Sequence, residues 1–444
     1  MVFSIAYHPA VRRKGLRLYN TRQQGMKKSL LFACFVIISA TGYANSLLIP
    51  MDDSQANHLK AYGIAYRVLQ DGAEMDWLLN YRGGSFLLPD NPAFATECRV
   101  RGVSFERLSD AKTAAILAQI ARPEVNMDAV KLLKAAKIVV YSPVKVSPAE
   151  FENTDAVLRV LTYAEIPFEV VYDEEILKGE LPKYDWLHLH HEDFTGQFGR
   201  NMGRMSAKDI QVQESIAKQF GYAKVSQMKL AVAKAIKGFC AGGGYLFAMC
   251  SATETLDLAL AAEGVDIVDA IYDGDGIDVD AQQRLDYGKT LAFGNFTIDA
   301  TGGYYGMTFS DINETAGGRR GGDDGPVSYF SLFDFSAKWD VIPTMLVQNH
   351  QSVIHEFFGQ TTAFRKTAVK PNVLVMGQGK TSDRYLYGEL GRGQWTFYGG
   401  HDPEGVRGQW RTPSDLNLHL HSPGYRLILN NVLFPSARKK KRKT

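Results

Sequence analysis

The chain has 444 residues, of which 45% are hydrophobic and 22% are charged, and these are ordinary values for a globular protein. A chain of this length can bury a substantial core, so it needs neither a metal nor disulfide crosslinks in order to fold. Its formal net charge is +2, but seven Lys/Arg lie in residues 1–44 and six lie in residues 438–443. Residues 45–437 therefore carry a formal net charge of −11, which argues against nucleic acid as a partner.

The N-terminus has the pattern of a secretory signal peptide. From Met26 it reads MKKSLLFACFVIISATGYANS, with two lysines, an apolar stretch, and the small residues Gly42 and Ala44 before a cleavage site. We therefore interpret residues 26–44 as a signal peptide and residues 1–25 as an over-extended translation start. The apolar stretch is short for a membrane span, and no later segment is a candidate. We expect an exported protein, periplasmic or secreted, without a membrane span.

Three cysteines remain after removal of the signal peptide: Cys98, Cys240 and Cys250. An odd number at irregular spacing is not a disulfide framework, even in an oxidising compartment. No C-x-x-C pair occurs in the sequence, which excludes a zinc ribbon and a thioredoxin-like redox motif. At least one thiol is therefore expected to stay reduced.

The first part of the mature chain, residues 45–134, predicts a small α/β region. The stretch SLLIPMD (46–52) has the composition of a strand, and apolar residues in 57–70 recur on one helical face up to Gly72. A second strand, EMDWLLN, is followed by the turn YRGGSF and by a further strand and helix. The sequence of this region does not indicate a chemical role.

Residues 135–437 predict a larger domain in which strands and helices alternate. Such alternation is typical of a parallel sheet with helices on its faces. Residues from about 270 to 345 interrupt the pattern as a loop-rich insertion, and residues 438–444 form a basic, solvated tail. Strands are expected at 136–144, 168–175, 184–191, 245–250 and 371–377 and within 384–401, and helices at 149–164, 226–244, 251–264 and 422–434.

Cys250 stands where the expected strand YLFAMC gives way to a helix, at the carboxyl end of a strand, where ligands gather in parallel sheets. Ala248 and Ala252 are small, as a sharp strand-to-helix turn requires. Ser251 and Glu254 match the S-x-x-E capping box, and a thiol at a helix N-terminus is favoured as its thiolate. Two interpretations remain open: Cys250 is a nucleophile, or it is a small buried hydrophobic residue.

A thiolate nucleophile needs a base, and His401 follows a second apolar strand in the stretch WTFYGGHDPE. Asp402 and Glu404 come directly behind it, and an acid there could orient the imidazole as the third member of a triad. By itself, His401 could equally be an ordinary loop histidine. Its significance comes from Cys250 at another strand end, because the two positions then carry complementary groups.

A third strand end carries a dense polar cluster in the stretch HLHHED. His188 is expected to be a hydrogen-bonded core residue, whereas the residues at the exit could position a substrate, supply oxyanion donors or bind zinc or iron. Their spacing matches no specific metal-ligand pattern, so we expect no metal and no other cofactor. A metal-dependent enzyme that also uses His401 remains an alternative. The residues at the exit are His190, His191, Glu192 and Asp193.

The strand-Cys-helix and strand-His-x-x-Glu pair resembles the class I glutamine amidotransferase-like fold, a three-layer flavodoxin-like parallel sheet that ThuA-like proteins share. In that family a cysteine elbow, usually G-x-C-x-G, is served by a later H-P-E. Here the two stretches read AMCSA (248–252) and HDPE (401–404). The roles that the resemblance implies are nucleophile for Cys250, base for His401 and orienting acid for Glu404. In the mechanism that we expect, the Ser251 backbone N–H and a group from residues 190–193, which replace the Gly-Gly oxyanion loop of the family, would hold the oxyanion.

Across nearly its whole mature length the chain is also similar to a group of exported Bacteroidota proteins commonly labelled asparagine synthetase B. The stretches NHLKAYGIAY, WLLNYRGGSFLL, YDWLHLHHEDFTGQ, LFAMCSAT, LFDFSAKWD, TFYGGHDPE and SPGYRLILNN carry this resemblance. Glutamine-hydrolysing asparagine synthetase B enzymes place a nucleophilic cysteine directly after the initiator Met and carry an S-G-G-x-D-S loop for ATP. Val2 follows Met1 here and the sequence contains no such loop, so its motifs support the label only weakly.

The sequence therefore predicts an exported Cys-His hydrolase, amidotransferase-like, that acts on an amide or related acyl bond of a small-molecule substrate. Attack by the Cys250 thiolate would give an acyl-enzyme while His401 moves the proton. Two alternatives remain open, a non-catalytic ThuA-like protein that binds a small polar or sugar-like ligand, and the metal-dependent hydrolase. The sequence indicates neither the individual substrate nor the oligomeric state.

Overall fold

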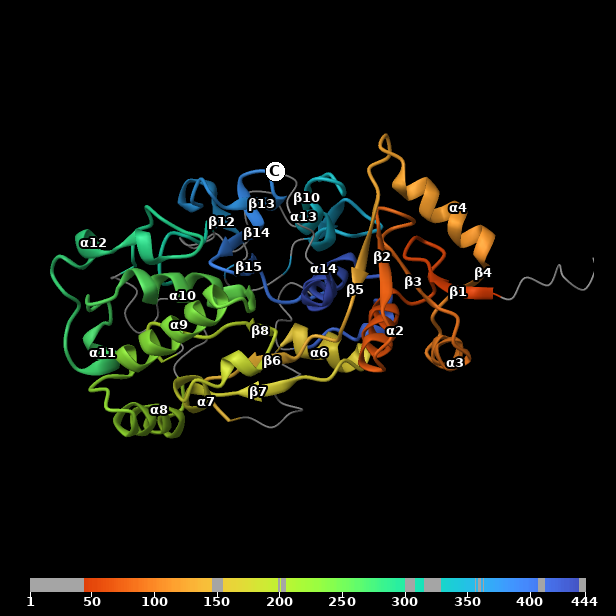
Figure 1. Ribbon diagram of the computed structural model, residues 1–444. Helices are drawn as coiled ribbons and strands as arrows, with labels where there is room; N and C mark the ends of the chain where they lie inside the picture. Colours follow the sequence, from red (N-terminus) through yellow and green to blue (C-terminus); the bar gives the residue numbers. More distant parts are fainter. Residues whose placement is uncertain are drawn as a thin grey trace, which may run out of the picture.

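The computed structural model describes residues 44–145, 155–198, 200, 205–299, 308–314, 329–355, 357, 361, 363–405 and 412–438. The expected over-extended start, almost all of the signal peptide and most of the basic tail lie outside the described residues, as do parts of the insertion. The described chain is an α/β protein with two β-sheets, as the sequence predicted (Figure 1). Within these ranges, no helix combines the length and the apolar character that crossing a membrane requires.

The N-terminal unit, residues 44–132, alternates strands and helices as its sequence pattern indicates. Its strands are β1 (Ala44–Ile49), β2 (Met75–Leu79), β3 (Ser85–Pro89), β4 (Glu106–Ser109) and β5 (Asp128–Leu132). Its helices are α2 (His58–Gln70), α3 (Pro92–Val100) and α4 (Asp110–Ala121).

The C-terminal unit, residues 138–437, contains the remaining described elements. Its strands are β6 (Ile138–Tyr141), β7 (Glu169–Val171), β8 (Trp186–Leu189), β9 (Tyr245–Met249), β10 (Tyr329–Leu332), β11 (Val353–His355), β12 (Phe364–Arg365), β13 (Leu374–Gln378), β14 (Ser382–Leu390) and β15 (Gly393–Tyr398). Its α-helices are α6 (Ala156–Ala164), α7 (Asp173–Leu177), α8 (Ala207–Gln219), α9 (Val225–Ala241), α10 (Cys250–Ala261), α11 (Ala270–Asp273), α12 (Ala281–Arg284), α13 (Val341–Leu346) and α14 (Pro423–Leu433). Short 3₁₀ helices are η1 (Leu181–Lys183), η3 (Tyr287–Lys289), η5 (Lys366–Ala368), η6 (Leu416–Leu418) and η7 (Phe434–Ser436).

The sheet of the N-terminal unit has five strands in the order β4-β1-β3-β2-β5, and all neighbouring pairs are antiparallel. The sequence predicted an α/β region here without specifying how its strands pair. Only residues 80–84 separate β2 from β3, whereas a parallel crossover needs about a dozen residues or more. Gly83 and Gly84 in this turn have φ of 75° and 90°, in the region that favours glycine.

The larger sheet is ten-stranded and mixed. Five strands are parallel and lie in the order β7-β6-β8-β9-β15. The sheet continues through antiparallel pairs from β15 to β14, β13, β10 and β11, and the short strand β12 pairs antiparallel with β14. The prediction of a parallel sheet is therefore correct for the first five strands and wrong for the others. The reason is visible at Gly391 and Arg392, where a hairpin instead of a crossover joins β14 to β15.

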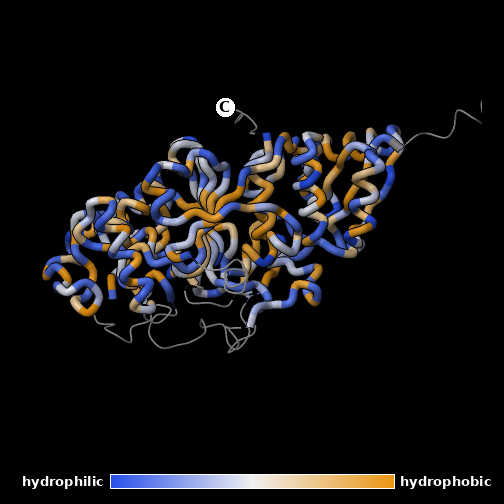
Figure 2. The backbone as a smooth tube through the Cα atoms, turned by 90° about the horizontal axis from the view of Figure 1, so that it is seen from below, coloured by the Kyte–Doolittle hydropathy of each residue, from blue (hydrophilic) through white to orange (hydrophobic). Residues whose placement is uncertain are grey.

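Helices cover both faces of the parallel strands (Figure 1). In β9, Leu246 and Ala248 belong to the apolar cluster that includes α9 and α10. Tyr245, Phe247 and Met249 of the same strand belong to the cluster that includes α2, α6 and α14. A strand that is buried on both faces needs such a continuous apolar sequence. Figure 2 shows hydrophobic segments gathered in the interior of the molecule.

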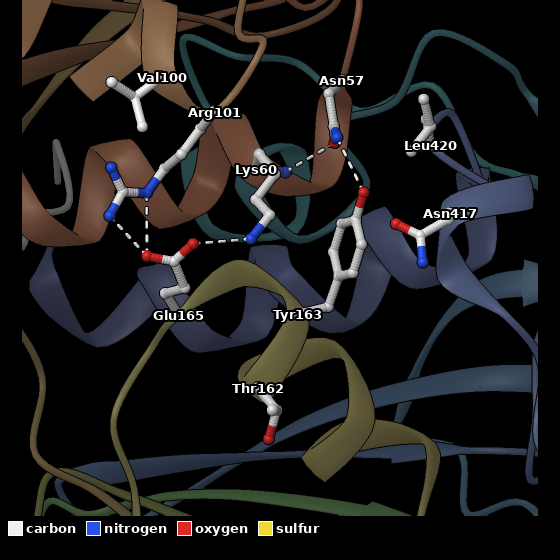
Figure 3. A pocket seen from close by; sticks show the side chains of 9 residues that line it. All are labelled: Asn57, Lys60, Val100, Arg101, Thr162, Tyr163, Glu165, Asn417 and Leu420. Atoms are coloured by element: carbon white, nitrogen blue, oxygen red, sulfur yellow. Dashed lines mark hydrogen bonds and ion pairs between the residues drawn. The ribbon is translucent and has the colours of Figure 1, made fainter. Parts of the chain in front are cut away.

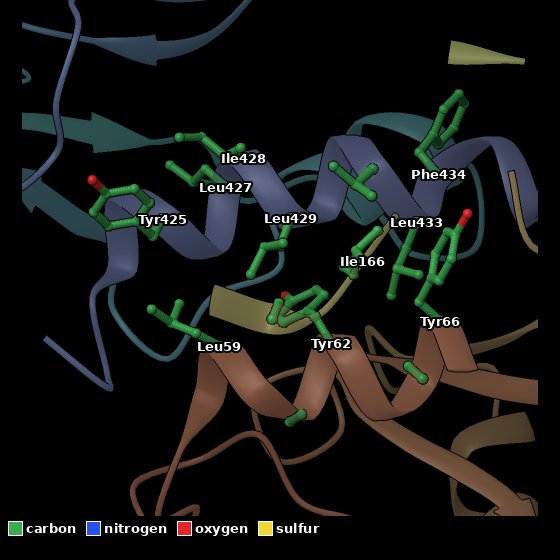
Figure 4. Close-up of a cluster of buried hydrophobic side chains, with 14 of the residues drawn as sticks. Leu59, Tyr62, Tyr66, Ile166, Tyr425, Leu427, Ile428, Leu429, Leu433 and Phe434 are labelled. Carbon is green, nitrogen blue, oxygen red and sulfur yellow. The ribbon is translucent and has the colours of Figure 1, made fainter. Parts of the chain in front are cut away.

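The N-terminal unit is attached to the C-terminal unit by packing of α2 on both α6 and α14. Tyr62 and Tyr66 of α2 point toward Leu429 and Leu433 of α14 in Figure 4, and all four side chains are buried. Burying an apolar side chain of this size contributes about 1.5–3 kcal/mol, so this contact is a substantial part of the core. The two units therefore share one apolar core.

Gly63 of α2 provides a test of how closely this helix approaches α6. A Cβ at Gly63 would stand 1.9 Å from the carbonyl oxygen of Ala164, so Gly63→Ala should lower the free energy of unfolding by about 1–3 kcal/mol. Gly238 of α9 is the matched control, because a Cβ there meets no described atom within 4 Å. Gly238→Ala should raise stability by about 0.5–1 kcal/mol through helix propensity alone. Chemical denaturation measures both values, and a stabilised Gly63→Ala variant would contradict the close packing.

Candidate functional site

The carboxyl ends of β8, β9 and β15 lie side by side at one edge of the sheet. The parallel register pairs Leu189 with Ala248, and Tyr398 with Met249. The segments that follow these strands therefore leave the sheet at the same edge, which is where parallel sheets bind their ligands. All three strand ends that the sequence singled out meet here.

Cys250 is the first residue of α10 and has φ of 50°, in the left-handed region that residues other than glycine seldom occupy. This is the sharp strand-to-helix turn that the small residues on either side of the cysteine predicted. The side chain is 2% exposed and belongs to the apolar cluster that includes α6 and α14. The backbone N–H of Ala252 donates to the carbonyl oxygen of His190 at 3.1 Å, so the elbow is tied to the exit of β8.

The predicted capping box at Ser251 and Glu254 is wrong. The helix begins at Cys250, and no described side chain caps its first turn. Glu254 accepts hydrogen bonds from the hydroxyls of Ser310 and Thr361, and burial raises its pKa to about 7. The backbone N–H of Ser251 lies in the first helical turn, where such groups have no intrahelical partner, and its role as an oxyanion donor stays a prediction.

Three histidines from two strand ends form a compact cluster. The ring centroids are 4.2 Å apart for His190 and His401, 4.6 Å for His190 and His191, and 5.4 Å for His191 and His401. Gly400 turns the chain toward His401 with φ of 110°, and a Cβ at this position would meet Phe357 at 2.3 Å. The structure thus brings together His190, His191 and His401, which the sequence had selected from separate motifs.

Loss of solvent around the rings lowers the pKa values of this histidine cluster, in which His190 is buried and His191 and His401 are half-buried. It lowers the pKa of His190 to about 4 and the pKa values of His191 and His401 to about 3 each. Repulsion between the rings lowers these pKa values further, and the carboxylate of Asp155 opposes the change. At neutral pH all three imidazoles are therefore neutral, which is the form that binds a metal ion or accepts a proton.

Asp155 is the carboxylate beside the cluster, and the sequence analysis missed it. It is fully buried at the N-terminus of α6, where it accepts hydrogen bonds from the N–H groups of Val157 and Leu158. Its two oxygens lie 2.9 Å from His190 Nδ1 and 3.2 Å from His188 Nε2. Burial raises the pKa of Asp155, but the two histidines outweigh it and hold the pKa well below its usual value. His188 is a hydrogen-bonded core residue, as predicted.

Three nitrogen atoms of the cluster are buried without a hydrogen-bond partner in the described part of the chain. They are His190 Nδ1, His190 Nε2 and His191 Nδ1, of which His190 Nδ1 has the Asp155 carboxylate 2.9 Å away as an ion-pair contact. Such atoms cost about 1–3 kcal/mol each, and in native proteins they commonly face a water or an ion. One ring nitrogen of each of the three histidines lies within 4.8 Å of the others. Nitrogen ligands of a tetrahedral zinc ion are about 3.4 Å apart, so small side-chain movements would close the cluster on a divalent ion.

The two acidic residues at the exit of β8 have different positions. Glu192 is buried and accepts a hydrogen bond from the backbone N–H of His190 at 2.7 Å. Burial raises the pKa of Glu192 to about 8, so its carboxyl group carries a proton for much of the time at neutral pH. Asp193 accepts a hydrogen bond from the backbone N–H of Thr195 at 2.8 Å, in the turn that follows. Glu192 is thus the acid that adjoins the histidine cluster from this segment.

Glu404, to which the resemblance assigns the orienting role, contacts a different histidine. Its Oε2 lies 3.1 Å from Nδ1 of His419. Asp402 is buried and binds Arg159 Nη1 at 2.7 Å and the hydroxyl of Tyr425 at 2.9 Å. The carboxylate that contacts the cluster itself is Asp155. The contact between a carboxylate and the cluster is therefore made to His190 from the start of α6, and the orienting role of Glu404 toward His401 stays a prediction.

The protonation state of His401 bears on whether the Cys250 thiolate or a water on a bound metal ion would be the nucleophile. An ordinary thiol has a pKa of about 8.5, so moving its proton to an imidazole of pKa about 3 costs roughly 7 kcal/mol before the ions attract each other. The N-terminus of α10 offsets about 1–2 kcal/mol of this cost at Cys250. A thiolate–imidazolium pair is therefore disfavoured, whereas a group of neutral imidazoles suits a cation.

A surface pocket of about 660 Å³ lies elsewhere, between α2, the end of α3 and α6 (Figure 3). Its charged side chains offset one another, because Glu165 binds Lys60 Nζ at 2.8 Å and Arg101 Nη2 at 2.5 Å. Partly exposed ion pairs of this kind contribute about 0–1 kcal/mol. None of the residues that line the pocket belongs to the histidine cluster.

No protein-family model and no curated protein matches the chain. Among solved structures, the chain has a distant likeness to the cytoplasmic protein STM3548 from Salmonella typhimurium, with 12% identity over 68% of this chain and 100% of that chain and a TM-score of 0.35. A catalytic mutant of the GH42 β-galactosidase Gan42B from G. stearothermophilus has 11% identity over 60% of this chain and 27% of that chain, with a TM-score of 0.25. At these TM-scores the likenesses carry no argument about function.

We expect Cys250 to react with iodoacetamide more slowly than an unfolded cysteine at about pH 7.5. The thiol is 2% exposed, and a neutral His401 does not stabilise its thiolate. Mass spectrometry of peptides measures the rate, with the denatured protein as reference. Cys240 is an internal control, since burial raises its pKa to about 12. Labelling of Cys250 faster than in the denatured protein would favour the thiolate nucleophile instead.

Proposed function

We propose that this protein is a metal-dependent hydrolase whose metal centre is formed by His190, His191 and His401. One observation carries the proposal: three uncharged imidazoles converge, one of them buried and two half-buried, and three of their nitrogens make no hydrogen bond in the described chain. Burying polar atoms without partners is unfavourable, and sites that depart from good packing in this way are commonly functional. The metal that the sequence analysis did not expect is therefore part of the proposal.

Neutral nitrogen ligands leave a zinc-class ion with its full double charge and with an open coordination position. Such an ion lowers the pKa of a bound water to about 7 and polarises a scissile carbonyl, which suits hydrolysis. A carboxylate at Nδ1 of His190 would hold the ring proton there and leave Nε2 as the ligand, and this is the role of Asp155. Glu192, whose pKa burial raises to about 8, can deliver a proton to the leaving group.

The finer assignments of fold, location and substrate belong to the same proposal. Numbered along the chain, the five parallel strands lie in the order 2-1-3-4-5, which is the order of a flavodoxin-like sheet. This order supports the class I glutamine amidotransferase-like, or ThuA-like, architecture. The signal-peptide pattern supports export to the periplasm or beyond. An amide or related acyl bond of a small molecule is the proposed substrate, and it rests on the family resemblance.

The left-handed conformation of Cys250 favours a second candidate, a cysteine hydrolase that uses the same strand ends. A strained residue of this kind costs about 1–3 kcal/mol and is typical of nucleophiles at strand-to-helix turns. The low pKa of His401 is the argument against it. Cys250→Ser separates the two mechanisms in a screen of chromogenic amides and esters, because only the metal mechanism keeps its rate in this variant.

The purified protein should hold about one zinc-class ion per chain, as measured by elemental analysis after gel filtration. His191→Ala and His401→Ala should each lower the metal affinity more than about 100-fold, because each removes a ligand. His419→Ala is the matched control, since this histidine pairs with Glu404 outside the cluster. Absence of stoichiometric metal from a protein that can also not be reloaded would end the proposal.

Asp155→Asn tests the orienting carboxylate. Asparagine can still accept the hydrogen bonds at the start of α6, so the melting temperature should change little. The metal affinity should fall about 10–100-fold, because the amide cannot hold the proton of His190 Nδ1 as strongly as a carboxylate. A competition titration with a chromogenic chelator measures the affinity. Unchanged affinity together with a lower melting temperature would assign Asp155 a purely structural role.

A further inference from the structure

A second group of buried basic side chains lies where the N-terminal unit meets α14. Arg426 of α14 is fully buried and donates hydrogen bonds to the carbonyl oxygens of Met51 (2.7 Å) and Gly83 (2.6 Å). Its Nη1 also lies 3.1 Å from Nδ1 of His350 and 3.3 Å from Nδ1 of His58. Among the described residues, no carboxylate forms an ion pair with Arg426. A buried cation is thus held by carbonyl oxygens, imidazoles and the side chain of Tyr62.

The hydrogen bonds of His58 determine which of its nitrogens carries the proton. His58 Nε2 lies 3.0 Å from the carbonyl oxygen of Asp52 and donates to it, so Nδ1 is left to accept from Arg426. The His58 ring also contacts the rings of His350 and His421, with centroids 4.5 Å and 4.9 Å away. Both Arg426 contacts to histidine therefore require neutral rings.

No other charged group in the described chain would offset the positive charge of a proton on His58 or His350. Three elements place titratable groups next to the network: α2 carries Tyr62, and the segment before α14 carries His421. In the N-terminal unit, Asp52 precedes α2 and Arg82 lies in the turn between β2 and β3. Asp52 is the carboxylate among them, and its side chain binds Arg82 at 2.7 Å. A proton on His58 or His350 would place a second positive charge against Arg426 and turn an acceptor into a donor.

We propose that Arg426, His58 and His350 form an acid-sensitive latch that holds the N-terminal unit against α14. The hydrogen bonds exist only while both imidazoles are neutral, and protonation replaces them with repulsion. The pKa values support this geometry: burial and then Arg426 lower the pKa of His58 to about 2 and that of His350 to about 4.

The sign of the pH dependence follows from these shifts. A histidine in the unfolded chain has a pKa of about 6.5, so below this pH the opened latch binds more protons than the closed one. Closure is therefore weakened as the pH falls from about 6.5, by roughly 30-fold per histidine at about pH 5. For His350 the loss levels off below its folded pKa of about 4.

The latch is connected to the candidate metal centre through α14. Tyr425 precedes Arg426, and its hydroxyl donates to Asp402, the residue that follows His401. Opening of the latch would therefore disturb the support of His401. The latch does not depend on the proposed metal centre. Its test measures hydrogen exchange, and neither activity nor metal content enters the result.

Hydrogen exchange of the full chain, followed by mass spectrometry between about pH 7.5 and pH 5, tests the latch. After correction for intrinsic exchange rates, the peptides covering α2 and α14 should lose protection on acidification in the wild type. In His350→Gln, whose amide oxygen can still accept from Arg426, the loss should be smaller by about 30-fold at pH 5. His355→Gln, an exposed histidine on β11, is the matched control and should behave as the wild type.

Two results would overturn the latch. One is an equal acid-induced loss of protection in His350→Gln and wild type. The other needs no variant and therefore stands even if His350→Gln does not fold. If the wild-type peptides of α2 and α14 keep their protection down to about pH 5, the contacts of Arg426 with the two histidines are not acid-sensitive.

Discussion

The parallel register of β8, β9 and β15 is the constraint on which the candidate site depends. A strand advances about 3.3 Å per residue, so a slip of two residues would separate the strand exits by more than the distance between the histidine rings. The segments that leave this edge of the sheet also bury His190 and half-bury His191 and His401. This loss of solvent keeps the imidazoles of His190, His191 and His401 neutral. Position and protonation state thus have one common cause, which is burial at the ends of paired strands.

Two helices on one face of the sheet complete the site and join it to the rest of the protein. Helix α6 presents Asp155 to His190 and, one turn later, Arg159 to Asp402. Helix α14 presents Tyr425 to Asp402 and Arg426 to the N-terminal unit. The N-terminal unit, for which the sequence indicated no chemical role, therefore adjoins a helix that supports the segment of His401. This arrangement gives it a physical route to influence the centre.

Local sequence patterns predicted the helices and strands well, but predicted poorly which side chains bond to each other and which strands pair in parallel. The strand and the helix around Cys250 were readable from an apolar run, small neighbours and a change of periodicity, all within a few residues. The capping box failed although its spacing was right, because Glu254 found hydroxyl partners in Ser310 and Thr361. The sequence analysis predicted more parallel strands than the structure has. A hairpin turn and a crossover helix can both separate two strands in the sequence, so alternation alone does not tell parallel from antiparallel pairs. Each error arose where a distant segment competed with a local pattern.

The sequence by itself determined that this is an α/β protein, and that cysteine, histidine and acidic residues follow three apolar strands. It did so because strand periodicity and the residues at strand ends are local properties. Only the tertiary structure decided that the histidines of two strand ends share one site, that Asp155 is their carboxylate, and that their rings are uncharged. Those features depend on burial and on contacts between segments far apart in the chain, and for a group as easily titrated as imidazole such contacts outweigh the intrinsic chemistry of the residue.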